Sequence, residues 1–216
     1  MRIYAIGSTV ADVLMQCGGT IARYLRDGSY VTIASCCPES IGNRDSETRL
    51  GDHEVFGSVR IEHYNMQDLA DTSSARDQIM DGIRGADAEV LLSPSPRSPD
   101  QTERQIARLV FNAAYAACVP NYTSPGGVPV TSTRAPILHM DHLGAFGVTT
   151  PEYVDISEVW GVKVQALELT SSSPEKSVAN AEVVNRARGI QVQREFAEVF
   201  TPELVWGRLG AVRFLP

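Results

Sequence analysis

The side chains that could do chemistry gather in short segments that follow strand-like runs of apolar residues. Asp12 is the only ionisable residue between positions 7 and 13, and Asp100 lies in a segment, 93–101, that contains three prolines. A lone carboxylate such as Asp12 can bind a sugar hydroxyl, cap the helix that follows, or remain solvated, and capping and solvation are the simpler explanations. Carboxylates at two such positions predict general acid–base chemistry on a polar ligand.

The segment 93–101 also offers hydroxyl, guanidinium and amide groups, from Ser98, Arg97 and Gln101. These groups suit a polar ligand such as a sugar, whereas zinc prefers sets of His, Cys or carboxylate side chains. A simpler role exists beside this one, because Ser98 followed by Pro99 is a typical start of a helix. We expect Ser98 to cap that helix whatever else the segment does.

One histidine cluster, His139 to His142, is the candidate for a metal site. Alternation along a strand puts His139 and Asp141 on one face and His142 on the other, which leaves two ligands where zinc needs three or four. The sequence therefore predicts no metal and no cofactor here, and His142 is better placed as a general base on a loop.

Several common kinds of site are not supported by the motifs. The Gly18-Gly19 pair lacks both the P-loop lysine and G-x-G-x-x-G spacing, which argues against nucleotide binding. No Gly-x-Ser-x-Gly elbow is present, and the four cysteines form no Cys-x-x-Cys pair.

Strand-like runs alternate with segments of helical period, which predicts an α/β fold with a mostly parallel sheet covered by helices. The expected strands are 3–6, 30–35, 59–63, 88–92 and 137–140. The expected helices are about 17–25, one from 47, 74–84, 99–117, 157–169 and 175–200. Ligands bind such sheets beyond the carboxyl ends of the strands, so the functional loops should be 7–17, 36–46, 93–101 and the residues after Met140. Residues 119–136 are rich in turn formers and predict a long surface loop.

Composition limits the class of protein. The 216 residues are 43% hydrophobic, which fits one domain over 1–216, and the net charge of -7 argues against nucleic acid or an anionic membrane as partner. The sequence has no signal peptide and no run of about 20 apolar residues, so we expect a cytoplasmic protein.

The first 28 residues resemble the start of PIG-L/LmbE proteins, a family of zinc-dependent N-deacetylases. The resemblance rests on the frame around Ala5–Asp12, on Cys17-Gly18-Gly19-Thr20 and on Asp27-Gly28. It continues through Glu47-Thr48-Arg49, Ser98-Pro99-Asp100-Gln101, Met140-Asp141, Ala166–Ser173, Arg186–Gln191, Phe196–Phe200 and Trp206-Gly207. It implies a three-layer, Rossmann-like domain.

The resemblance also implies that the zinc site of the family is largely lost. Of the three zinc-ligand positions, Asp12 keeps its carboxylate, while Thr9 and Gln101 stand where the family has histidines. The other changed positions are Ala11 for the general base, Leu14 for a nearby acid, Ser98 for the first histidine of the second motif and Thr170 for a late histidine. One carboxylate with neutral hydroxyl and amide groups is a weak zinc site, so the ancestral amide hydrolysis should be absent.

The resulting expectation is a metal-free, repurposed enzyme that acts on a sugar-containing or amino-sugar-like small molecule. The catalytic candidates are Asp12, Asp100, Asp141 and His142. The candidates for substrate binding are Thr9, Glu39, Arg49, Arg97, Ser98, Gln101 and Thr170. A non-catalytic pseudoenzyme that binds a sugar-like ligand is the alternative, and a surviving zinc deacetylase is the third interpretation. The resemblance further implies a homo-oligomer, trimer or hexamer, or a mixed oligomer with an active relative.

Overall fold

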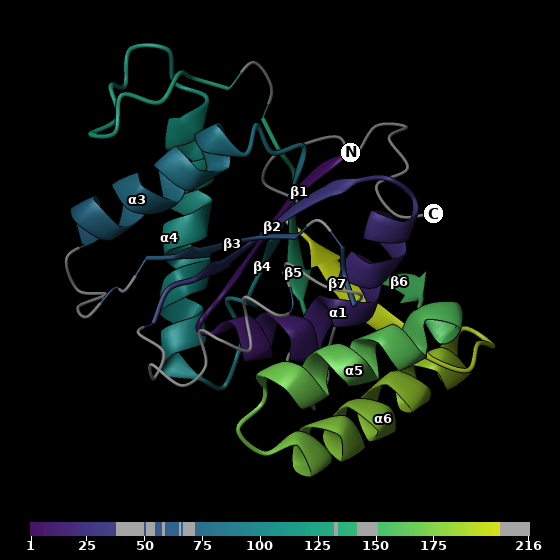
Figure 1. The fold of residues 1–216 in the computed structure, drawn as a ribbon. Helices are drawn as coiled ribbons and strands as arrows, with labels where there is room; N and C mark the ends of the chain where they lie inside the picture. Colours follow the sequence, from purple (N-terminus) through teal and green to yellow (C-terminus); the bar gives the residue numbers. More distant parts are fainter. Residues whose placement is uncertain are drawn as a thin grey trace.

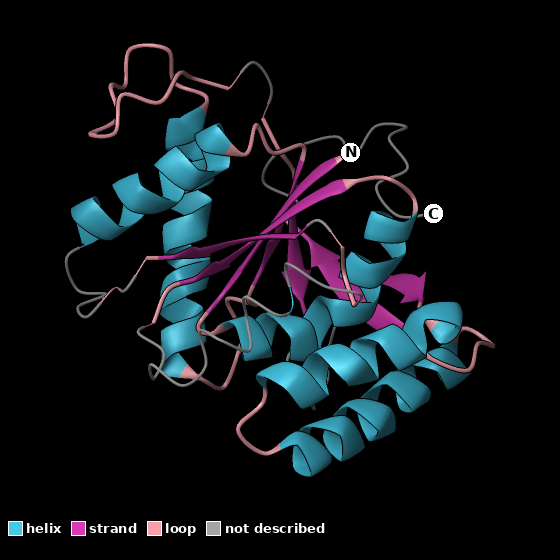
Figure 2. Cartoon of the chain, viewed as in Figure 1, coloured by secondary structure: helices cyan, strands magenta, loops and turns pink. Residues whose placement is uncertain are grey.

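The computed structural model describes residues 1–37, 50, 55–57, 59–64, 66, 72–131, 134–141 and 151–203. Within this part of the chain, seven strands form one sheet in the order β3-β2-β1-β4-β5-β7-β6 (Figures 1 and 2). The expected helix from 47 and the site candidates Glu39, Arg49 and His142 lie outside the described residues. No helix of the described part is long and apolar enough to cross a bilayer.

Five strands run parallel and form most of the sheet, as the alternating pattern predicted. They are β1 (Arg2–Gly7), β2 (Tyr30–Ser35), β3 (Val59–His63), β4 (Val90–Ser93) and β5 (Ile137–Met140). The central strands are almost wholly buried, which explains their continuous apolar runs, because both faces of a parallel sheet are covered. All five agree with the predicted strands to within two residues at each end.

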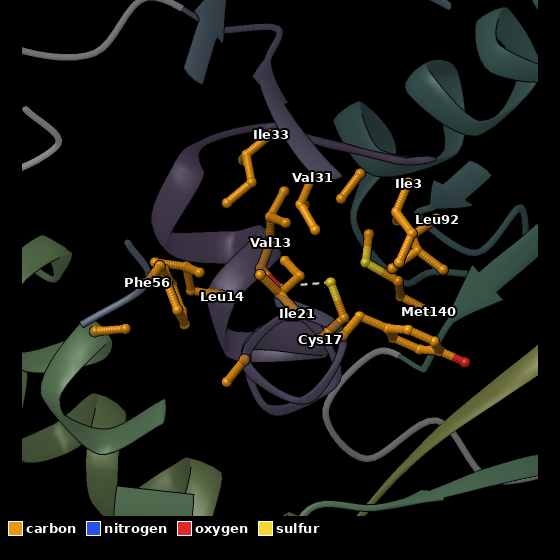
Figure 3. Packing of buried hydrophobic residues seen from close by; sticks show 14 of the residues in the cluster. Ile3, Val13, Leu14, Cys17, Ile21, Val31, Ile33, Phe56, Leu92 and Met140 are labelled. Carbon is orange, nitrogen blue, oxygen red and sulfur yellow. Dashed lines mark hydrogen bonds between the residues drawn. The ribbon is translucent and has the colours of Figure 1, made fainter. Parts of the chain in front are cut away.

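Helices cover both faces of the sheet and complete the three layers (Figures 1 and 2). On one face lie α3 (Thr72–Gly85) and α4 (Gln101–Ala117), and their apolar side forms one core cluster with the sheet. On the other face lie α1 (Val10–Arg26) and α5 (Trp160–Thr170), with α6 (Pro174–Gln191) packed against α5. Figure 3 shows side chains of this second core cluster, among them Ile3, Val13, Leu14, Cys17, Ile21, Val31, Ile33, Leu92 and Met140.

The expectation of one helix over 175–200 is wrong. That segment forms α6, which ends at Gln191, and then β7 (Ala197–Pro202), which pairs antiparallel with β5 and with β6 (Glu152–Asp155). The first four residues of β7 are all buried, as expected for a sheet strand covered on both faces and not for a helix with one exposed side. The helix expected over 157–169 is a short 3₁₀ turn, Ser157–Val159, followed by α5.

The described residues of the 119–136 segment contain no helix or strand, as expected for a loop, and they are firmly anchored. The buried Arg84 guanidinium donates to five backbone carbonyl oxygens, those of Ala116, Ala117, Val119, Tyr122 and Val128, at 3.1–3.5 Å. Because α4 runs from the carboxyl end of β4 back to the start of β5, this loop lies at the far end of α4 from the carboxyl end of β4 (Figure 1). A helix of this length spans about 25 Å, so the loop does not cover the carboxyl end of the parallel strands.

Candidate functional site

Two helices begin side by side where β1 and β4 end. These strands are hydrogen-bonded neighbours, and each is followed closely by a helix, α1 after β1 and α4 after β4. Thr9 is the N-cap of α1 and Asp100 is the N-cap of α4. Helix N-termini carry partial positive charge and unpaired N–H groups, so this edge of the sheet favours carboxylates and polar ligands.

Thr9 and Asp12 form a mutual pair at the start of α1. The backbone N–H of Asp12 donates to the Thr9 hydroxyl at 3.1 Å, and that hydroxyl donates to Oδ2 of Asp12 at 2.8 Å. The expectation that α1 begins near Cys17 is therefore wrong, because Thr9 caps a helix that starts at Val10. Asp12 remains partly exposed in the first turn.

Glu103 is the buried centre of the arrangement at α4. Its side chain accepts a 2.5 Å hydrogen bond from the Ser98 hydroxyl and a 2.7 Å bond from the Gln16 side-chain amide. Its backbone N–H donates at 3.0 Å to Asp100, so Asp100 and not Ser98 is the cap of α4. Ser98 is instead turned into the protein, where its hydroxyl also accepts from the Asp100 N–H at 3.1 Å. We call Thr9, Asp12, Gln16, Ser98, Asp100 and Glu103 the polar cluster.

The charges of the polar cluster alter the acidity of Asp12. Burial raises the pKa of the Asp12 carboxyl above its ordinary value, the Thr9 hydrogen bond opposes this, and the nearby Glu103 and Asp100 carboxylates raise it further. Asp12 is thus a partly exposed carboxyl that holds its proton to higher pH than an ordinary aspartate. A raised pKa is one feature of carboxyls that act as general acids or bases.

Gln16 presents a buried acceptor. Its Oε1 atom is buried and has no hydrogen-bond partner in the described part of the chain, while its Nε2 atom is fixed by Glu103. Buried polar atoms are almost always paired, so a water or a ligand donor is expected at this atom. A hydroxyl group of a bound molecule would meet that need.

The remaining predicted residues are placed in different ways. Asp141 forms a 2.5 Å ion pair with Arg188 of α6, and the Asp141 side chain is only 7% exposed. The Thr170 hydroxyl is buried and donates to the Ala166 carbonyl one turn earlier in α5, at 2.8 Å. Arg97 and Gln101 are exposed at the start of α4. The structure therefore brings Thr9, Asp12, Ser98 and Asp100 into one cluster, with Gln101 beside it.

Solved structures confirm the fold. The chain aligns with the conserved protein TT1542 from Thermus thermophilus (TM-score 0.80, 16% identity, 96% of this chain and 99% of that one). It also aligns with GalB, the 4-carboxy-2-hydroxymuconate hydratase from Pseudomonas putida (TM-score 0.78, 18% identity, 98% of this chain and 99% of that one). A third similar structure is the N,N'-diacetylchitobiose deacetylase from Pyrococcus horikoshii (TM-score 0.75, 14% identity, 98% of this chain and 87% of that one). No family model and no curated protein sequence matches the chain.

The chain has the fold of PIG-L/LmbE-type deacetylases, as the motif resemblance predicted. That fold implies zinc, so the residues at the three zinc-ligand positions can be tested for fit. The Thr9 hydroxyl donates to Asp12 and so directs a hydrogen, not a lone pair, toward the carboxylate. Gln101 is a neutral amide on the exposed start of α4. Among the described residues no three His, Cys, Asp or Glu side chains are grouped to hold a metal. This donor set does not fit zinc.

Sequence reasoning missed two members of the polar cluster. Gln16 follows Asp12 by four residues, and Glu103 follows Asp100 by three, so each is one helical turn from a predicted site residue. The spacing Asp100-x-x-Glu103 is also that of a capping box, with the carboxylate in the third helical position. The missing information was that helix α1 starts as early as Val10.

Proposed function

We propose that the chain is a metal-independent enzyme in which the Asp12 carboxyl acts as a general acid–base group on a hydroxyl-rich, sugar-like small molecule. The observation that carries the proposal is the position of Asp12: partly buried, beside two further carboxyls, where two helices begin. Catalytic carboxyls are tuned by burial and by neighbouring charge, and both causes act on Asp12.

The polar cluster suits a ligand that carries hydroxyl groups. The unpaired Oε1 of Gln16 needs a donor, and the partly exposed Asp12 carboxyl accepts hydrogen bonds or donates one when protonated. Arg97 and Gln101, exposed at the start of α4, add donors at the rim. A sugar ring presents several hydroxyls that both donate and accept, so it can satisfy these groups together.

The reaction class follows from two carboxyls without a metal. Asp12 and Asp100 provide one group to take a proton and one to give a proton, which supports elimination, isomerisation or transformation of a glycoside. Neighbours of the same fold include a hydratase, a diacetylchitobiose deacetylase and a deacetylase of teicoplanin biosynthesis, so this fold is compatible with more than one reaction. The hydratase supports an elimination or hydration step in particular. In an elimination one carboxylate takes a proton from carbon and a carboxylic acid protonates the leaving hydroxyl, so that the C–O bond breaks and water departs; hydration is the reverse.

One observation favours a second function, that of a binding protein without turnover. Each oxygen of the Glu103 carboxylate accepts a hydrogen bond, one from Ser98 and one from Gln16, and the Asp12 carboxylate is held by Thr9. Polar groups that are held in place by one another, with one acceptor left over at Gln16, form a rigid surface that suits recognition as well as catalysis. The two functions differ only in whether a bound ligand is converted.

The experiment compares binding and conversion in protein stripped of metal by a chelator. N-acetylglucosamine and N,N'-diacetylchitobiose serve as probes, with binding followed at the Gln16 side-chain amide by NMR and conversion followed in the sugar spectrum. Asp12→Asn should bind a probe yet not convert it, whereas Asp27→Asn, an exposed aspartate at the other end of α1, should do both. Binding without conversion by the unmodified chain would favour the binding protein. Acetate release that requires added zinc would refute the proposal.

A further inference from the structure

We infer that a buried ion pair between Lys163 and Glu198 is a positioning element for the polar cluster. The pair holds α1 broken at Cys17. It thereby fixes the short helix Val10–Gln16, which we call the front half of α1. The geometry of the break carries the inference, and only its relevance to catalysis rests on the proposed function.

Helix α1 is interrupted at Cys17, whose φ of -140° and ψ of 18° are not helical. In a continuous helix the Gly19 N–H would donate to the Met15 carbonyl, four residues earlier. Here both groups have other partners. Gly19 donates to Oε1 of Glu198 at 2.9 Å, and the Met15 carbonyl accepts from Nζ of Lys163 at 2.8 Å. The ion pair thus stands in the place of a helix hydrogen bond.

The charges of the pair match the two helix ends that the break creates. The Glu198 carboxylate accepts from the Gly19 and Thr20 N–H groups, the second at 2.7 Å, so an anion lies at the N-terminus of the rear half. The Lys163 ammonium lies at the last carbonyls of the front half. An anion at a helix N-terminus and a cation at a C-terminus are both favourable, so the pair stabilises the broken form of α1 over the straight one.

The ion pair between Lys163 and Glu198 is buried and held by further hydrogen bonds. The two side chains are fully buried and their N–O distance is 2.6 Å. Lys163 also donates to Oδ1 of Asn185 at 2.9 Å, and Nδ2 of Asn185 donates to the Ala197 carbonyl at 3.0 Å. Elements α1, α5, α6 and β7 therefore meet at one point. A buried ion pair adds little stability by itself, so a role in fixing geometry is the better explanation.

The front half of α1 links the ion pair to the polar cluster, because it contains Asp12 and Gln16. Thr9 caps its first turn, Asp12 lies in that turn, and Gln16 at its end donates to Glu103. Successive helical residues differ by about 100° around the axis, so a small rotation of the front half would remove Gln16 from Glu103 and turn Asp12 away from the carboxylates at the start of α4. A straight α1 would impose such a rotation.

The test is Lys163→Met, which removes the cation and keeps most of the side-chain volume. Two NMR readouts are taken on the unliganded protein: the Cys17 backbone shifts and the hydrogen exchange of the Gln16 side-chain amide. We expect Cys17 to move toward helical shifts and the Gln16 amide to exchange about tenfold faster or more. Val110→Ala, in the core on the opposite face of the sheet, should lower the melting temperature and leave both readouts unchanged.

If Lys163→Met does not fold, two further measurements test whether the ion pair holds the break in α1. Glu198→Gln keeps the size of the side chain and removes its charge, and it should move the same two readouts. In the unmodified protein, the Gly19 and Thr20 amides should exchange as slowly as those in the middle of a helix, because Glu198 accepts both. Unchanged readouts in a folded variant, or fast exchange at Gly19 and Thr20, would overturn the inference. None of these results depends on a ligand, so they leave the proposed function to its own test.

Discussion

The Thr9 hydroxyl donates a 2.8 Å hydrogen bond to the carboxyl of Asp12 and accepts one from the Asp12 backbone N–H at 3.1 Å. One side chain therefore caps α1 and orients the carboxyl that we place at the centre of the chemistry. The motif resemblance implies a zinc ligand at position 9, and the threonine found there donates a hydrogen bond to Asp12 instead.

Asp12→Asn should make the protein more stable at neutral pH. The pKa of Asp12 is raised in the folded state, chiefly by burial, so the stability it contributes is present at low pH and is lost as the pH rises through the raised value. Asparagine cannot ionise and avoids this loss. Urea unfolding of both proteins between pH 3 and pH 8 should show the advantage of the variant at neutral pH shrinking toward acid pH. A variant that is less stable than the parent at neutral pH contradicts the assignment.

Glu103→Gln should lower the pKa of Asp12 toward its ordinary value. The substitution removes one of the two neighbouring carboxylates that raise it, while burial still keeps it above the usual range. The side-chain carboxyl carbon of Asp12, followed by NMR against pH, measures this directly. Glu168→Gln, on the exposed side of α5, is the matched control and should leave the Asp12 titration where it was.

Gly19→Ala should destabilise the protein by about 1–3 kcal/mol, a typical cost of overpacking a core. A Cβ atom at position 19 would lie 2.7–2.8 Å from three side-chain atoms of Ile156. Gly161→Ala in α5 is the control, because a Cβ there meets nothing within 4 Å and alanine favours a helix. Thermal melts should separate the two variants. Equal stability for both would mean that Ile156 does not pack against the break in α1.

Arg84→Lys should release the loop 119–131 and leave the polar cluster intact. An ammonium cannot reach the five carbonyl oxygens that the guanidinium spans, so we expect a loss of about 2 kcal/mol or more. Limited proteolysis should cut this loop faster, while the Gln16 side-chain amide keeps its signal. A shift of that amide would contradict the placement of the loop at the far end of α4.

The parallel part of the fold was predictable because its signals are local. Tyr30–Ser35 is rich in β-branched residues and Ile137–Met140 is a short, mostly apolar run after a proline, and both were predicted with the bounds observed. Strand β7 was missed because it follows a helix after a few residues and its character comes from pairing with β5 and β6, which are distant in sequence. The predicted start of α1 was too late in the sequence, because the residues at the break near Cys17 resemble a helix start. The Gly19 and Thr20 N–H groups after this break are indeed capped, but by the distant Glu198 side chain.

The site was predictable only in part. Asp12 and Asp100 could be chosen from residue type and from their place after strands. The bond between Gln16 and Glu103, which joins the two helix starts, depends on which faces of α1 and α4 turn toward each other, and that is decided by packing on the sheet. Asp141 was also chosen from residue type, but the structure pairs it with Arg188, which lies 47 residues away in the sequence and could not be predicted as its partner. Glu39, Arg49 and His142 stay predictions.

The most direct test of the central claim is a titration of chelator-treated protein with N,N'-diacetylchitobiose, in which zinc content, ligand binding and products are measured on one sample. The account predicts a zinc content well below one ion per chain before the chelator is added, and, after its addition, a ligand-induced shift of the Gln16 side-chain amide and no release of acetate. Restoration of acetate release by one equivalent of zinc, with the metal held at Asp12, would contradict it.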